Sequence, residues 1–167
     1  MWDWAGNDQD CEPDVVIACS GDVLTLETLA AVTLLRQHLP ELKIRVNNVV
    51  DVFKLERNTK YTHGLCDKDF DELFTIDKPV IFAFHGYPWL VHRLTHNQAN
   101  NKNIHVRGYK EEGIITTLFD MIILNEIDRF HLVMDVIDGT PQTGSKGIHL
   151  KQQLMDKLIE QLLYYKW

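Results

Sequence analysis

The chain has 167 residues, of which 45% are hydrophobic and 25% charged, and its formal net charge is −7. These proportions are typical of one globular domain with a sizeable core, and they exclude disordered and fibrous proteins. The negative charge disfavours a nucleic-acid partner, because binding to phosphates needs a basic surface.

The sequence carries no membrane, secretion or metal signal. No apolar run approaches the ~20 residues that span a bilayer, and the polar first ten residues lack the basic start of a signal peptide. Cys11, Cys19 and Cys66 are widely spaced and form no CxxC pair, which predicts reduced thiols in place of a zinc or redox site. We therefore expect a cytoplasmic protein with no membrane partner and no metal ligands in this chain.

The first elements predict a strand, a helix and a second strand. Residues 14–20 form a short apolar run closed by Gly21, typical of a strand buried on both faces. Residues 24–39 have helical spacing and are stopped by Pro40. Residues 44–50 are the next strand, which completes a βαβ unit.

The middle of the chain repeats this alternation. Residues 51–63 are polar and predict a loop, and residues 67–74 predict a short helix. Residues 80–84 (VIFAF) are the most strand-like segment. A helix over residues 89–96 should follow, with Pro88 at or near its first turn.

The last third continues with a loop over residues 97–103 and a strand over residues 104–109. Two helices are then expected, over residues 116–125 and 128–138, the second of them capped by Asp128. A linker rich in helix breakers, 139–147, leads to an amphipathic helix at 148–167.

Strands that alternate with helices predict an α/β fold in which a mostly parallel sheet lies between two helical layers. We divide the chain into an N-terminal linker segment (1–14), an α/β domain (15–140), and a linker with a C-terminal helix of the same domain (141–167). Ligand-contacting groups should lie where the strands end.

One candidate cofactor turn is Gly21-Asp22, which is followed by the pair Asn47-Asn48. Asp and Asn oxygens are ligands for Mg²⁺, and a glycine turn lets the backbone approach a diphosphate. Val23 opposes that approach, and both asparagines lie within a strand-like run. A strand-to-helix turn is the competing interpretation.

A second candidate is His85, with Tyr87 and Trp89, at the end of the VIFAF strand. Arg93 follows on the next helix and could face a ligand or another domain. His92 and His96 are spaced as metal ligands on a helix, but without a third ligand nearby a solvated face is the competing interpretation.

A third candidate is the charged turn that holds Arg107 and Lys110, between a strand and a helix. Either cation could hold a phosphate or a partner's carboxylate. The alternative is a surface turn whose charges compensate each other. Asp128 and His131 could share a hydrogen bond, but no nucleophile motif accompanies them, which favours capping over catalysis.

Large aromatic residues gather at both ends of the chain: Trp2, Trp4, Tyr164, Tyr165 and Trp167. Such side chains are normally packed against something. The sequence leaves two interpretations open, one in which they face another domain and one in which the two ends pack on each other.

Two segments, FAFHGYPWLVHRLT (residues 82–95) and VRGYKEEG (residues 106–113), carry a family resemblance. With WDWAGNDQD (residues 2–10) and LNEIDRFHLVMDVID (residues 124–138), they closely resemble the C-terminal domain of xylulose-5-phosphate/fructose-6-phosphate phosphoketolase. The resemblance runs from Trp2 to about Asp138 and more loosely to Trp167. Met1 directly before the family-like WDWAGNDQD indicates a piece cut from a longer protein or a truncated gene.

The resemblance implies the C-terminal fold of transketolase, a three-layer α/β/α sandwich with a five-stranded mixed sheet in which one strand is antiparallel. It implies thiamine diphosphate and Mg²⁺ for the full-length enzyme, bound by N-terminal domains that are not in this sequence. No catalytic, cofactor-binding or metal-binding residue is therefore assigned to this chain. The apolar segment 114–119 departs from the family pattern and leaves open how its helix starts.

Three functional hypotheses follow from the sequence. The first is a non-catalytic domain that packs against the thiamine-binding domains and supports a homodimer. The second is a regulatory module that binds a small anion or nucleotide near His85, Arg93, Arg107 and Lys110. The third is a minimal cofactor site at Gly21-Asp22 and Asn47-Asn48.

Overall fold

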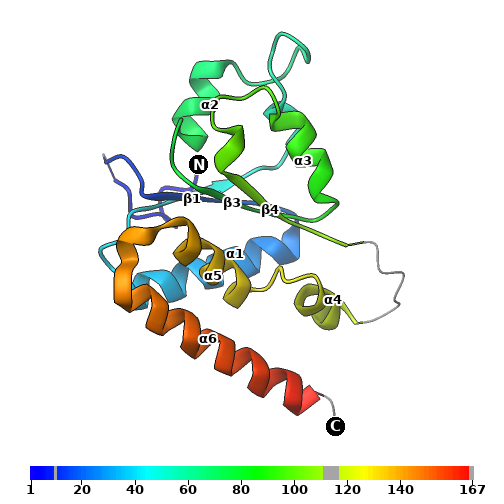
Figure 1. The fold of residues 1–167 in the computed structure, drawn as a ribbon. Coiled ribbons are helices and arrows are strands. Elements are labelled where there is room, and N and C mark those ends of the chain that lie inside the picture. The colour runs from blue at the N-terminus through cyan, green and yellow to red at the C-terminus, as the bar shows by residue number, and fades with distance from the viewer. Residues whose placement is uncertain (10, 111–116, 166–167) are drawn as a thin grey trace.

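A computed structural model describes residues 1–9, 11–110 and 117–165 of the chain as three layers (Figure 1). The middle layer is a sheet of four parallel strands in the order β2-β1-β3-β4. The strands are β1 (Val15–Ser20), β2 (Ile44–Asn48), β3 (Val80–Phe84) and β4 (Ile104–Arg107). The expected three-layer α/β/α architecture is confirmed.

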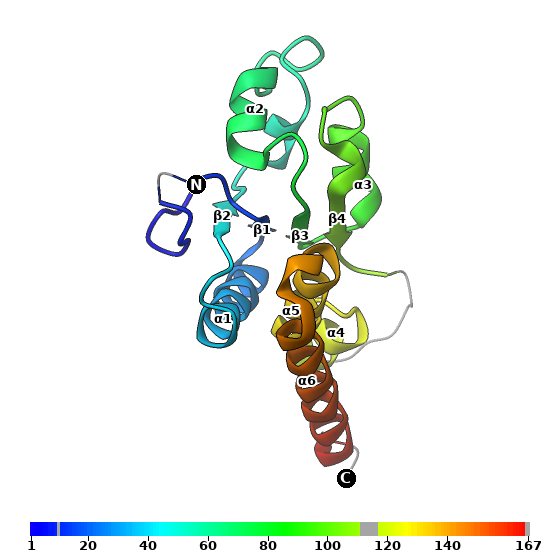
Figure 2. The same cartoon turned by 60° about the vertical axis from the view of Figure 1, so that its left-hand side comes forward.

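Helices cover both faces of this sheet (Figures 1 and 2). One face carries α2 (Asp67–Phe74) and α3 (Pro88–Thr95), and the other carries α1 (Asp22–His38) and α5 (Arg129–Gly139). Outside these lie α4 (Leu118–Leu124) and the long α6 (Gly144–Tyr165), which packs on α5 and extends away from the sheet. Within the described ranges, no helix combines the length and the apolar character that a membrane span requires.

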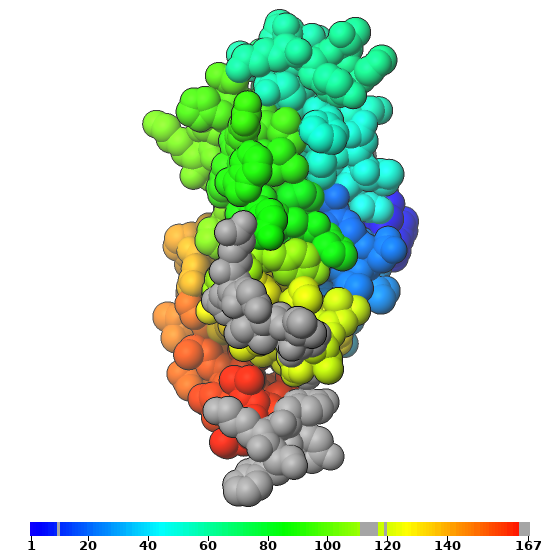
Figure 3. All heavy atoms as spheres, turned by 90° about the vertical axis from the view of Figure 1, so that its right-hand side faces the viewer, coloured from blue at the N-terminus to red at the C-terminus, as the bar shows by residue number. Residues whose placement is uncertain are grey.

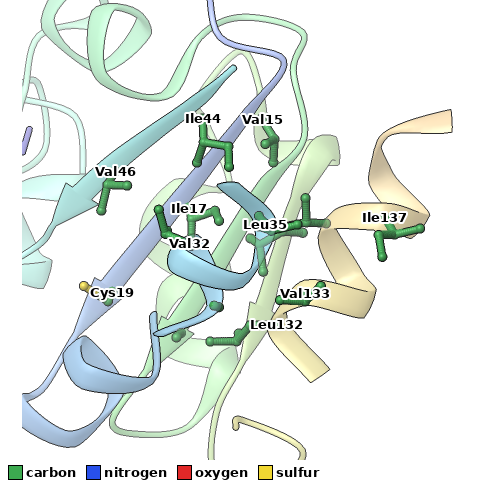
Figure 4. Packing of buried hydrophobic residues seen from close by; sticks show 14 of the residues in the cluster. Val15, Ile17, Cys19, Val32, Leu35, Ile44, Val46, Leu132, Val133 and Ile137 are labelled. Carbon is green, nitrogen blue, oxygen red and sulfur yellow. The ribbon is translucent and has the colours of Figure 1, made fainter. Parts of the chain in front are cut away.

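The central strand β1 supplies side chains to two separate cores. Val15, Ile17 and Cys19 point into the cluster that α1 and α5 close (Figure 4). Val16 and Ala18 point into the cluster on the α2 and α3 side. Successive side chains of a strand face opposite ways, so a run that is apolar at every position requires a helical layer on each face.

Local capping sets several helix boundaries. The Asp128 carboxylate accepts hydrogen bonds from the backbone N–H groups of Phe130 and His131, which confirms it as the cap of α5. Thr117 caps α4 in the same way by accepting from the backbone N–H of Asp120. Pro88 is the first residue of α3, as expected from its lack of a backbone N–H.

The N-terminal segment runs along the outer edge of β2. Trp2 donates its backbone N–H to the Val46 carbonyl at 2.8 Å, and Asn7 donates to the Ile44 carbonyl at 3.0 Å. The Asn7 side chain adds bonds to the backbone of Leu42 and Ile44. These contacts cover an edge that would otherwise expose unpaired backbone groups.

The sheet differs from the expected one in strand number and direction. The described residues form four strands, all of them parallel, where the family resemblance implied a fifth, antiparallel strand. After β4, the described part of the chain is helical, because apolar residues there recur every three or four positions instead of alternating. The start of the expected helix 116–125 falls partly on residue 116, which is outside the described residues.

Several segments also differ from the expectations. The segment 139–147 contains the end of α5, the 3₁₀ turn η3 (Pro141–Thr143) and the start of α6, so it is not an irregular linker. The expected loops at 51–63 and 97–103 contain the 3₁₀ turns η1 (Val52–Leu55) and η2 (Asn101–Asn103). Strand β4 ends at Arg107 because the backbone of Tyr109 turns to the Gly86 carbonyl.

The two ends of the chain do not pack on each other in the described structure. Trp2 lies partly buried against the core and contacts Trp4, with ring centroids 5.3 Å apart. The end of α6 lies far from the N-terminus in both views (Figures 1 and 2). Trp167 and the side chains of Tyr164 and Tyr165 lie outside the described part.

Replacing Leu35 with Ala tests the core between α1 and the sheet. Leu35 is fully buried, so the cavity should lower the free energy of unfolding by about 3 kcal/mol. Leu26→Ala, on the exposed side of the same helix, should change it by less than about 0.5 kcal/mol. Urea unfolding followed by circular dichroism measures both. Equal effects would contradict the described orientation of α1.

Candidate functional site: the carboxyl end of the sheet

A cleft of about 410 Å³ opens where the strands end. The chain leaves β1 into α1 on one face of the sheet and leaves β3 into α3 on the other face. Parallel α/β sheets have their natural binding crevice at such a reversal. The cleft is lined by Ser20, Gly21, Asp22, Thr25, Asn48, Val49, Val50, Phe84 and His85.

Gly21 joins the two central strand ends. Its φ of 115° is one that residues with a side chain rarely adopt, and a Cβ built on it would lie 2.4 Å from the Cβ of His85. The backbone N–H of His85 donates to the Ser20 carbonyl at 2.9 Å and holds the two turns together. Glycine is therefore required here by both conformation and space.

The three predicted residues follow β3 within one short stretch of chain. The His85 ring meets the Tyr109 ring edge to face, with centroids 5.1 Å apart. Tyr87 precedes the first residue of α3, and Trp89 lies in its first turn, with 44% and 60% of their surfaces exposed. These two aromatic side chains form part of the exposed surface beside the cleft.

The predicted cations lie elsewhere. Arg107 forms a two-bond pair with Asp135 on α5, at 2.6 and 2.7 Å, and a third bond with Glu126 at 2.7 Å. Lys110 lies 3.3 Å from the same Glu126 carboxylate. Both cations are therefore paired with carboxylates that lie outside this turn. Arg93 is exposed on α3.

The Arg107 network connects the edge strand β4 to α5. Burial alone would raise the pKa of the Asp135 carboxyl, but hydrogen bonds from Arg107 and His105 hold that pKa below its ordinary value. The hydrogen bond with Asp135 in turn raises the pKa of the Arg107 guanidinium. The Asp135 side chain is only 9% exposed, so this carboxylate depends on its partners to remain charged.

The structure tests whether the Gly21-Asp22 turn fits a magnesium-bound diphosphate. Asp22 and Asn48 do line the same cleft, and Asn48 is the last residue of β2. Asn47 has its amide on the other side, where it donates to the Leu73 carbonyl at 2.7 Å, and Val23 lies within α1. Because the Asn47 side chain faces away from Asp22 and no Arg or Lys lines the cleft, these side chains do not fit the group.

The remaining reactive groups have structural roles. Asp128 contacts the Nδ1 atom of His131 while it caps α5. Cys19 is buried, and burial raises the pKa of its thiol, which makes it a poor nucleophile. In the described residues, no group of three His, Cys, Asp or Glu side chains is placed to hold a metal ion.

Asp135 and Glu126 were not identified from the sequence. Asp135 did carry a signal, because a lone carboxylate inside the apolar run LVMDVI is rarely buried without a partner. The sequence could not identify Asp135 as the partner of Arg107, because the two residues lie 28 positions apart. Only the packing of α5 beside β4 brings them together.

The sequence of the chain matches a known domain family. The chain matches the XFP C-terminal domain family over residues 1–166. It is 65% identical over 164 residues to "Probable phosphoketolase 2" of Nostoc sp.. The aligned region covers 98% of this chain and 21% of that protein. The chain belongs to the XFP C-terminal domain family.

Two further relatives agree. "Probable phosphoketolase 1" of Rhizobium meliloti is 64% identical over 96% of this chain and 20% of its own length. "Probable phosphoketolase" of Rhodopirellula baltica is 63% identical over 98% of this chain and 21% of its own length. The chain therefore spans about a fifth of the length of the curated relatives it matches. The predicted family resemblance is confirmed.

Gly21→Ala tests the turn between the central strand ends. The combined strain and clash with His85 should lower the free energy of unfolding by on the order of 3 kcal/mol. Gly144→Ala is the matched control, because Gly144 also has a positive φ but has open space around it, so it should cost only about 1 kcal/mol. Thermal and urea unfolding measure both. A smaller effect at Gly21 than at Gly144 would contradict the close approach.

Arg107→Gln tests the ion pair with Asp135. At pH 7 the variant should be less stable by about 2 kcal/mol, because a poorly solvated carboxylate loses its partner. The contribution of a carboxyl with a lowered pKa is present above its unfolded value, about 3.9, and disappears as the pH falls through the folded value. The difference from the parent should therefore shrink below about pH 4.

Urea titrations at several pH values make this measurement. Arg93→Gln, at an exposed position, should stay within about 0.5 kcal/mol of the parent at every pH. A loss that stays constant from pH 7 to pH 3 would show that Arg107 acts by packing and not through the Asp135 charge.

Proposed function

We propose that the chain acts as the C-terminal domain of a phosphoketolase that depends on thiamine diphosphate and Mg²⁺. That enzyme would cleave a ketose phosphate with inorganic phosphate to give acetyl phosphate and an aldose phosphate. The observation that carries the proposal is the family match over residues 1–166. The relatives that match carry the name phosphoketolase, and the chain spans about a fifth of their length.

In this proposal the domain contributes structure, packing against the N-terminal thiamine-binding domains, and support for a homodimer. Its own polar groups favour that role over catalysis. Arg107 forms ion pairs with Asp135 and Glu126. The side chains of the cleft that Asp22 lines do not fit a magnesium-bound diphosphate. The cofactor would therefore be held by other domains, in a cytoplasmic enzyme.

A regulatory module for a small anion or nucleotide is the second candidate. The cleft at the strand ends supports it, because α/β folds bind ligands there. The charge of the cleft does not support this candidate, because the acidic Asp22 lines it. Arg107 lines a different hollow, between β4 and α5. We therefore rank the regulatory module second to the packing role.

The test compares the isolated chain with a chimera in which it replaces the matching region of the Nostoc relative. The isolated chain, given thiamine diphosphate, Mg²⁺, ketose phosphate and inorganic phosphate, should form no acetyl phosphate, and its melting temperature should not change with the cofactor. The chimera should form acetyl phosphate, and the same relative truncated before this region is the control. Turnover by the isolated chain, or a folded but inactive chimera, would contradict the proposal.

A further inference from the structure

Several large apolar side chains are exposed at the carboxyl end of the sheet, and Figure 3 shows the face of the molecule that holds this end. The exposed fraction is 90% for Val50, 65% for Leu26 and 60% for Trp89. Val50 follows β2, Leu26 lies in the helix after β1, and Trp89 lies in the helix after β3. Together with Tyr87 and Phe53, which are also exposed, we call these the carboxyl-end surface. Large apolar side chains that are exposed at one end of a domain typically mark a contact with another protein surface.

We propose that the carboxyl-end surface is where the N-terminal, catalytic part of a phosphoketolase packs against this domain. The inference rests on the proposed function and adds to it the residues that make the contact. Trp89 and Tyr87 would be its anchors, because large, rigid aromatic side chains dominate the energy of protein interfaces.

The position of the N-terminus supports this occupant. Met1 lines a hollow of about 340 Å³ together with residues 47–51, so the chain begins beside the carboxyl end of β2. In the relatives, about four-fifths of the protein lies outside the matched C-terminal domain. Polypeptide that precedes the matched region would therefore join this domain next to Val50 and the cleft.

The hollow beside Met1 suits apolar groups of a docked partner. It is lined by apolar side chains of Leu55, Leu65, Leu73 and Phe74, and by Asn47. Asn47 is 2% exposed, and its Oδ1 atom has no hydrogen-bond partner among the described residues. Because that atom is itself inaccessible, a docked surface would fill the hollow with an apolar side chain and would not reach the Asn47 oxygen.

The exposed apolar face of α6 is the competing surface. It consists of Ile148, Met155, Ile159, Leu162 and Leu163. This face lies on a helix that extends away from the sheet, and its end is far from the N-terminus in both views (Figures 1 and 2). It therefore serves as an internal control of similar chemistry.

Hydroxyl-radical footprinting of the isolated chain and of the chimera tests the proposal directly. Oxidation of Trp89 and Tyr87 should fall about fivefold or more in the chimera, because interface cores exclude water, while oxidation of Met155 should not change. Protection of Met155 and Leu162 with unchanged Trp89 would overturn the proposal in favour of α6.

A matched pair of substitutions gives an independent measure. Trp89→Ser in the chimera should raise the rate of proteolysis at the junction about tenfold, the effect of losing an interface anchor. It should leave the melting temperature of the isolated chain within about a degree, since surface changes are nearly neutral. Ile159→Ser, at a position 55% exposed on α6, should change neither. The reverse pattern would overturn the proposal.

Two other occupants are separate outcomes. Trp89 protection that grows with the concentration of the isolated chain, together with dimers in sedimentation, would assign the surface to a second copy and overturn the proposal. Protection of the isolated chain by inorganic phosphate or a nucleotide alone would assign it to a small ligand and also overturn it. Acetyl phosphate formation by the chimera separates these failures from a failure of the proposed function.

Discussion

Burial of β1 on both faces is the constraint on which the rest of the structure depends. Its residues alternate between two cores, one closed by α1 and α5 and the other by α2 and α3. A strand that is apolar from Val15 to Cys19 cannot leave either face in water. The two helical layers follow from it, and they enclose the parallel strands in the order β2-β1-β3-β4.

The same constraint decides which part of the domain is free for contacts. With helices over both faces and the N-terminal segment along β2, the carboxyl ends of the strands are the part of the sheet that the described residues leave most open. Gly21 permits the close approach of the two central turns, and the chain around them presents Trp89 and Val50 to the exterior. The Arg107–Asp135 pair has a different role, since it joins the edge strand β4 to α5. The Arg107 guanidinium is paired in this contact.

Much of the fold could be predicted because local patterns determine it. The VIFAF run, Pro88 at the start of α3 and the Asp128 cap carry their own conformational signals. The pairing of Arg107 with Asp135 and the docking of Asn7 on β2 could not be predicted, because each joins residues far apart in the sequence. His85, Tyr87 and Trp89 were located correctly at a strand end. Their separation from Arg107 depends on the direction in which each side chain leaves the sheet.

The most direct test of the central claim is an electron cryo-microscopy reconstruction of the chimera at side-chain resolution. The measured quantity is the distance from Trp89 and Val50 to the nearest atom of the N-terminal part. Our account predicts van der Waals contact, within about 4 Å, with α6 outside that interface. A carboxyl end that faces solvent, with the N-terminal part seated on α6 instead, would contradict it.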